Sequence, residues 1–250
     1  MKKIIIALLA IIICLSFCGC GKTMCSIEGC ENEAVEDTTY EEVLCNKHLS
    51  SKKAFEVSKA AYDNIGVAYE IIEQIGSDIY HVWLLGIYKK DELIENGSEY
   101  LASDLSLSED EIKSGIGCII AELFGSSWEN ASEEDKKMYS NDADIWLSFY
   151  KDDLATFCVF SVINAYEING KMEEAQIALD AAKANMKELS EKYSDYEHYP
   201  NLKGYYTTTS SFFDFCQNPT GSFEQAKETI NDYKNEARDY ASDLDYIFED

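Results

Sequence analysis

Hydrophobic residues recur every three or four positions along most of the chain after residue 51, which is the spacing of one face of an α-helix. From Ser51 to Ile75 they form a single stripe about seven turns long. The run Gly76-Ser77-Asp78 then predicts a helix stop, because glycine commonly ends helices and Ser or Asp commonly caps the next one. A second, almost wholly apolar helix is expected from Ile79 to about Tyr88.

The same periodicity continues to the end of the chain. Residues 90–108 are mixed, so only a short helix around Asp91–Ile94 and a loop through Gly97 are expected there. The last segment, Phe223–Ile247, keeps its apolar residues in strict 3-4 alternation and predicts a long helix packed antiparallel on its neighbours. Between them we expect helices at 108–124, at 132–139, at 142–169 as one or two helices, at about 171–193 and at 200–217. The first of these is expected to begin with a capping box formed by Ser108 and Glu111.

Composition agrees with this helical pattern. The 250 residues contain only two prolines and 13 glycines, and 46% of positions are hydrophobic, enough to bury a sizeable core. We therefore expect a mainly α protein, an up-and-down helical bundle with extra short helices, preceded in sequence by a small zinc-binding knuckle and hairpin. Its domains are expected at 1–19 (signal peptide), 20–50 (lipid-anchored zinc-binding segment) and 51–250 (helical bundle).

The charge of the chain excludes one class of partner. The formal net charge is −26, and it becomes −28 when Lys2 and Lys3 leave with a signal peptide. Because such an acidic surface repels nucleic acid and anionic lipid, we expect no nucleic-acid partner.

The N-terminus has the pattern of an export signal. Lys2 and Lys3 precede the apolar run Ile4–Phe17, which at 14 residues is too short for an ordinary membrane-spanning helix. A plain secretory signal with incidental cysteines is the alternative.

The next residues, Phe17-Cys18-Gly19-Cys20, resemble the lipobox of bacterial lipoproteins of the Gram-positive type. In that family a small residue precedes the cysteine that receives the lipid, and Gly19-Cys20 fits, whereas Phe17 departs from the usual aliphatic residue. The resemblance implies lipidation (diacylglycerol, palmitate) at Cys20 and a place on the extracytoplasmic face of the cell membrane, with the anchor as the membrane contact.

Four metal-competent side chains follow within 24 residues. Cys25, Cys30, Cys45 and His48 have the spacing C-x4-C-x14-C-x2-H. Thiolate and imidazole are the ligands that zinc prefers, and short spacings let each pair come from one turn. Gly29 can take a positive φ to fold the first two sulfurs together. Because four protein ligands close the coordination sphere, we expect a structural Zn²⁺.

Disulfide bonding is the main alternative for an exported chain, although three cysteines leave one thiol unpaired. Between the two ligand pairs, Ala34-Val35 and Tyr40–Leu44 predict a small hairpin around a polar turn. Knuckle, hairpin and helix together resemble a treble-clef or related short Cys₃His zinc finger. The other three cysteines of the expected helices, Cys118, Cys158 and Cys216, are interpreted as small buried hydrophobes.

No catalytic motif is recognisable in the helical part, so we expect no enzyme activity there. His81 and His198 are interpreted as ordinary core or surface histidines. A stretch of hydroxyls between aromatic pairs suggests a speculative ligand pocket of Tyr205, Tyr206, Thr209 and Phe213. The simpler interpretation, which we favour, is that the rings belong to the core.

Three functions remain open from the sequence. The first is a lipid-anchored binding module whose helical domain binds another surface protein or a small ligand. The second is zinc handling, that is, delivery or sensing at the cell surface. The third is an enzyme with an unrecognised site in the helical body.

Overall fold

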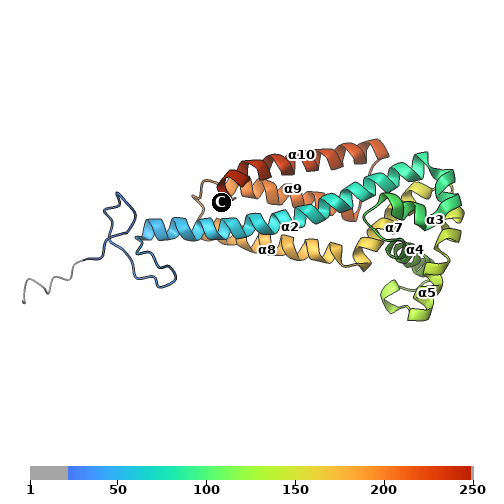
Figure 1. Cartoon of the computed structure of the whole chain (residues 1–250), viewed down its shortest axis with the longest axis horizontal. Helices are drawn as coiled ribbons and strands as arrows, with labels where there is room; N and C mark the ends of the chain where they lie inside the picture. The colour runs from blue at the N-terminus through green and yellow to red at the C-terminus, as the bar shows by residue number, and fades with distance from the viewer. Residues whose placement is uncertain (1–21, 249–250) are drawn as a thin grey trace, which may run out of the picture. The chain divides into compact units, whose positions relative to one another are not determined.

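The computed structural model describes residues 22–248 and divides into two compact units, with the boundary between Phe55 and Glu56. Cys20, the expected lipidation site, lies outside the described residues. Figure 1 shows the helices, whose bounds are α2 (Asn46–Tyr88), α3 (Lys90–Asp104), α4 (Glu109–Leu123), the 3₁₀ helix η1 (Trp128–Asn130), α5 (Glu133–Asn141), α6 (Ala143–Phe149), α7 (Leu154–Ile168), α8 (Lys171–Lys192), α9 (Tyr199–Gln217) and α10 (Phe223–Phe248).

The first unit is a small folded segment in which two isolated antiparallel bridges are the β-structure of its described residues. Met24 pairs with Glu33, and Ala34 pairs with Cys45. The Val35 N–H donates to the Leu44 carbonyl at 2.9 Å. The second bridge therefore joins the two segments from which the hairpin was expected.

The second unit is a helical bundle with additional short helices, which confirms the expected fold class. Helix α9 packs against both α8 and α10, and the shorter helices α3 to α7 contact one another at one end of the long helices (Figure 1). Phe212 of α9 stacks on Tyr233 of α10 at 5.5 Å between ring centroids, and Gly204 lies against Tyr240. Residues late in α9 therefore contact residues early in α10, and residues early in α9 contact residues later in α10. Helix α10 is thus antiparallel to α9, as its periodicity predicted.

Helix α2 runs without interruption through Gly76-Ser77-Asp78, so the predicted stop at these residues is wrong. Gly76 is needed for close packing instead, because a Cβ there would lie 2.5 Å from the Phe212 ring. The Ser77 hydroxyl donates a hydrogen bond of 2.8 Å to the Glu73 carbonyl one turn earlier. Its donor is therefore satisfied without leaving the helix.

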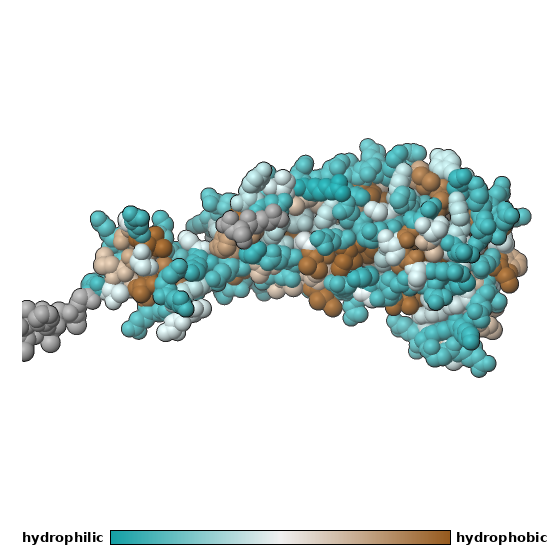
Figure 2. Space-filling model, viewed as in Figure 1, coloured by the Kyte–Doolittle hydropathy of each residue, from teal (hydrophilic) through white to brown (hydrophobic). Residues whose placement is uncertain are grey.

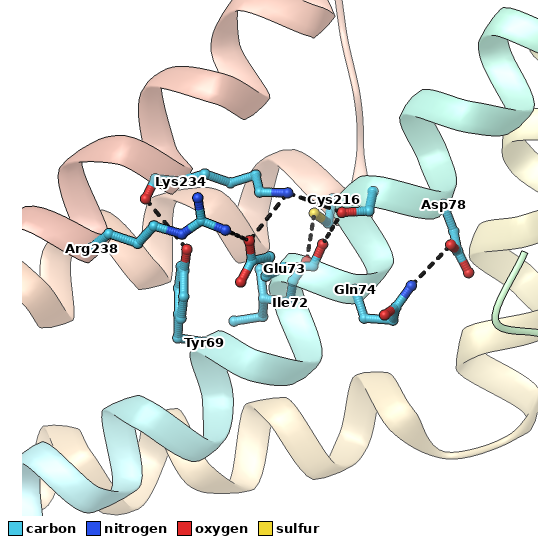
Figure 3. Close-up of polar contacts among 9 residues, drawn as sticks. Tyr69, Ile72, Glu73, Gln74, Asp78, Cys216, Lys234 and Arg238 are labelled. Atoms are coloured by element: carbon cyan, nitrogen blue, oxygen red, sulfur yellow. Dashed lines mark hydrogen bonds and ion pairs between the residues drawn. The ribbon is translucent and has the colours of Figure 1, made fainter. Parts of the chain in front are cut away.

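Asp78 is the buried polar centre of this unit, with 2% of its surface exposed. Its carboxylate accepts hydrogen bonds from the Tyr166 hydroxyl of α7 (2.6 Å), from the Ser106 backbone N–H (2.9 Å) and from the Gln74 amide (3.0 Å; Figure 3). Burial and the bond to Asp78 together raise the pKa of Tyr166. A buried carboxylate is tolerated only when such donors replace water.

A second polar group joins α2 to α10. The Glu73 carboxylate pairs with Lys234 at 3.1 Å and with Arg238, and the Tyr69 hydroxyl donates to the Lys234 carbonyl at 3.3 Å (Figure 3). These ion pairs are partly exposed to solvent, so they fix the orientation of α10 against α2 more than they stabilise the fold.

Caps define the short helices. Ser108 and Glu111 form the expected capping box of α4. In α3 the expected break at Gly97 takes the form of a kink with φ 66° inside a longer helical segment. Asp144 of α6 accepts from the Ser98 backbone N–H and hydroxyl, both at 2.8 Å, and so caps the turn that follows the kink.

The surface in view in Figure 2 is largely hydrophilic with scattered hydrophobic patches, as the net charge of −26 implies. Among the described residues, no helix is both long and apolar enough to cross a membrane.

We predict that Asp78→Ala lowers the free energy of unfolding by about 1–3 kcal/mol, because the buried Tyr166 hydroxyl loses its acceptor. Urea denaturation followed by circular dichroism measures it. Glu70→Ala on the exposed side of α2 is the control and should change it by less than about 0.5 kcal/mol. Equal effects of the two substitutions would contradict the role given to Asp78.

Candidate metal centre

The first ligand pair lies on a tight loop. Gly29 takes φ 77°, as predicted, and the Cys30 N–H donates to the Ile27 carbonyl at 3.0 Å. The Cys25 N–H donates to the Asn32 carbonyl, also at 3.0 Å, which closes the loop at its base. The positive φ reverses the chain between the two cysteines and brings both sulfurs to one side.

The second pair lies where α2 begins. Cys45 forms the bridge to Ala34 and directly precedes the first helical residue, and its carbonyl accepts from the Leu49 N–H at 2.9 Å. His48 is in the first turn, earlier in the chain than the helix start expected near Ser50. A hydrogen bond from the His48 backbone N–H holds the pKa of the Cys45 thiol below its ordinary value. The helix N-terminus thus favours the thiolate, the form that binds metal.

The four side chains converge on one point, although the two pairs are separated by 14 residues. Their ligand atoms all lie within 4.8 Å of one another. His48 Nδ1 is 3.2 Å from Cys25 Sγ and 3.6 Å from Cys45 Sγ, and Cys30 Sγ is 3.8 Å from Cys45 Sγ. This Cys₃His group could hold a metal ion.

Burial is unequal around this centre. Cys25 and Cys45 are 7% and 2% exposed and pack with Leu44, whereas Cys30 and His48 are half-buried. A shallow groove of about 380 Å³ runs beside the last two, lined in part by Glu28 and Glu31. The Asn32 amide lies 3.5 Å from Cys30 Sγ and can donate to it.

The structure contradicts the disulfide alternative. All six cysteines among the described residues are free, and the 3.8 Å between Cys30 Sγ and Cys45 Sγ is far beyond a bond of about 2.05 Å. Cys158 and Cys216 are fully buried and Cys118 is partly buried, as interpreted from the sequence. Burial raises the pKa of Cys118 to about 11 and that of Cys158 to about 12, so both stay protonated thiols.

The speculative pocket of the sequence analysis falls largely in the core. Tyr205, Thr209 and Phe213 are 3%, 0% and 2% exposed, and Tyr206 is half-buried. The Tyr205 ring lies about 6 Å from those of Tyr62 and Tyr69, and burial raises its pKa. The Thr209 hydroxyl is the one buried side-chain polar atom of residues 22–248 without a hydrogen-bond partner. These contacts agree with the interpretation that the aromatic rings belong to the core.

The two other histidines belong to the helical unit. His81 is exposed on α2, beside the Tyr80 ring. His198 lies just before α9, where Nε2 is 3.2 Å from a Glu197 carboxylate oxygen and the ring meets Tyr196 edge-on.

Two features were missed by sequence reasoning. Asp78 was assigned to a helix stop, although Ile75 and Val82 lie on the same helical face, and this spacing could have revealed that it is buried. The second feature is a cavity between α4 and α7, which is lined by residues distant in sequence and therefore cannot be predicted from a local sequence pattern.

Comparisons with protein-family models, with curated proteins and with solved structures find no match for this chain.

We predict that the purified protein binds one divalent metal ion per chain and that Cys30→Ser/Cys45→Ser abolishes binding, because two of four ligands are lost. Elemental analysis after dialysis measures the stoichiometry. Cys118→Ser, which changes a thiol in the helical unit, is the matched control and should keep the metal. Retention of metal by the double variant would rule out this site.

Proposed function

We propose that this protein is a lipid-anchored, extracytoplasmic binding protein in which Cys25, Cys30, Cys45 and His48 hold a structural zinc ion. The helical unit is its binding domain, for a small ligand or another surface protein. The observation that carries the proposal is the convergence of three sulfurs and one imidazole nitrogen within 4.8 Å.

The distances support zinc as the metal. Bond lengths of about 2.3 Å to sulfur and 2.0–2.1 Å to nitrogen in a tetrahedron place two sulfurs about 3.8 Å apart and sulfur and nitrogen about 3.6 Å apart. The corresponding distances here are 3.8 Å for Cys30–Cys45, and 3.6 and 3.2 Å for His48 with Cys45 and Cys25. Thiolate-rich sites of this kind disfavour calcium and magnesium, which prefer oxygen.

The number of ligands supports a structural role. Four protein ligands leave no open position for a substrate or an activated water. Among the described residues 22–55, the apolar cluster of this unit consists of the buried residues Cys25, Leu44 and Cys45, with Cys30 and Leu49 packed against them. So small a core does not stabilise a fold alone, and metal binding supplies the missing free energy.

We predict that zinc removal unfolds the first unit and leaves the helical unit folded. Hydrogen exchange of the full chain, with and without a chelator, should show protection lost at least about tenfold over residues 23–48. Protection over residues 91–217 serves as the internal control and should not change. Unchanged exchange at 23–48 would exclude a structural role.

The anchor rests on the sequence pattern Lys2-Lys3, Ile4–Phe17 and Gly19-Cys20. Cys20, which follows the small residue Gly19 at the end of the apolar signal, supplies a thiol to which a lipid can be attached.

Cys20→Ala is expected to release the protein from the membrane fraction and abolish incorporation of labelled palmitate. Cys18→Ala, two residues earlier, is the matched control and should remain lipidated. A Cys20→Ala protein that kept its lipid label would contradict the anchor.

Zinc delivery is the second candidate, and the partial exposure of Cys30 and His48 beside the acidic groove favours it. An exposed thiolate and imidazole are accessible to a competing ligand from an acceptor protein. Exchange with isotopically labelled zinc separates the two functions: a delivery site exchanges within minutes, whereas a structural site retains its ion for hours.

A further inference from the structure

A cavity of about 300 Å³, open to solvent, lies between α4 and α7 in the helical unit. Its size is at the lower end of the range for small-molecule sites, about 300–1,000 Å³. Its lining comes from the end of α4, from the segment between α6 and α7, and from the first half of α7: Ile119, Glu122, Tyr150, Asp153, Thr156, Phe157, Phe160 and Asn164.

The two helices are antiparallel and held rigidly beyond the cavity. Glu111 accepts from the Asn169 side chain at 2.9 Å. Further along, Gly115 lets the backbones touch, because a Cβ there would lie only 2.0 Å from the Ser161 carbonyl oxygen. The cavity lies at the opposite end of this pair, where Ile119 and Phe157 line it. The close contact fixes the geometry of its walls.

One wall of the cavity is aromatic. The rings of Tyr150 and Phe157 stack with centroids 4.3 Å apart and an interplanar angle of 12°. Trp146 packs on the outer side of Tyr150 at 6.3 Å. Phe160 is 41% exposed, although it is a large apolar residue in the middle of α7. This wall offers apolar surface to a ligand.

The charges at the cavity are all negative. Glu122 and Asp153 line it, and the lining contains no lysine, arginine or histidine. Asp153 occupies the N-cap position of α7, yet its carboxylate makes no capping hydrogen bond, although Asp commonly makes one. Burial, and to a lesser extent the negative charge of Glu122, raise the pKa of Glu167 on α7. Within residues 22–248, neither Glu122 nor Asp153 takes part in a salt bridge.

We infer that this cavity binds a small organic cation, an ammonium compound with an apolar or aromatic body. The ammonium group is held by Glu122 and Asp153, and the apolar body lies against Tyr150 and Phe160. Carboxylates select a cation, and the aromatic wall selects an organic cation over a hydrated metal ion. The inference rests on the proposed binding role of the helical unit and is independent of the zinc ion and the lipid.

Isothermal titration calorimetry of the full zinc-loaded protein tests it with 2-phenylethylammonium and its neutral counterpart 2-phenylethanol. The ammonium compound should bind saturably at one site, and the alcohol at least about tenfold more weakly, because only the charge differs appreciably. Calcium ion, the third probe, should not compete with the ammonium compound. Equal affinity for the ammonium compound and the alcohol, no saturable binding, or displacement by calcium would each overturn the inference.

Variants locate the site. Glu122→Gln/Asp153→Asn should weaken ammonium binding at least about tenfold, and Phe160→Ala should weaken it by removing the apolar wall. The matched control is Glu228→Gln/Asp232→Asn, which neutralises two carboxylates of a surface groove on α10 that has no aromatic lining. Unchanged melting temperatures establish that the variants are folded, and ammonium binding that the Glu122/Asp153 variant retains in full would refute the site.

The same titration after zinc removal separates this inference from the proposed function. Every lining residue belongs to the helical unit, so ammonium binding should persist without zinc. Binding that disappears with the zinc ion would contradict the independence of the two sites, and zinc binding without ammonium binding would refute the cavity alone.

Discussion

The helical unit depends on a buried carboxylate. Asp78 is 2% exposed, and its three donors come from α2 itself, from the segment between α3 and α4, and from α7. Because leaving the buried Tyr166 hydroxyl unpaired costs about 1–3 kcal/mol, these bonds favour one arrangement of the three segments. The aliphatic side chains around Asp78 supply most of the burial energy, but they are interchangeable in shape, whereas the hydrogen bonds are directional. Asp78 therefore specifies the fold more than it stabilises it.

The first unit differs from the helical unit, since its described residues form only a very small apolar core. Two isolated bridges, one glycine with positive φ and the first turn of α2 bring four ligands together. Each of these features is weak by itself. A metal ion held by three sulfurs and a nitrogen would convert them into one fold, and this is why we propose a structural role for the metal. We propose that the specific binding function belongs to the helical unit, with the acidic and aromatic cavity between α4 and α7 as its ligand site.

Local signals in the sequence predicted local structure well. The Ser108 capping box and the Gly29 conformation were predicted because each depends on residues within a few positions. The cluster of Cys25, Cys30, Cys45 and His48 was predicted from its spacing, since few folds use such spacing otherwise. The spacing alone left the disulfide alternative open, and the free thiols of the structure decided against it.

What could not be predicted depends on partners distant in the chain. Gly76 ends no helix because Phe212, far along the sequence, packs against it. Two of the three donors to Asp78, Tyr166 and Ser106, are distant from it in the sequence. The cavity has the same origin, because Glu122 and Asp153 come from different helices whose pairing no local pattern specifies.

X-ray absorption spectroscopy at the zinc edge of the purified native protein tests the central claim most directly. We predict three sulfur ligands at about 2.3 Å and one nitrogen at about 2.0–2.1 Å, a closed Cys₃His shell. A spectrum without zinc, or with oxygen ligands in place of sulfur, would contradict the account.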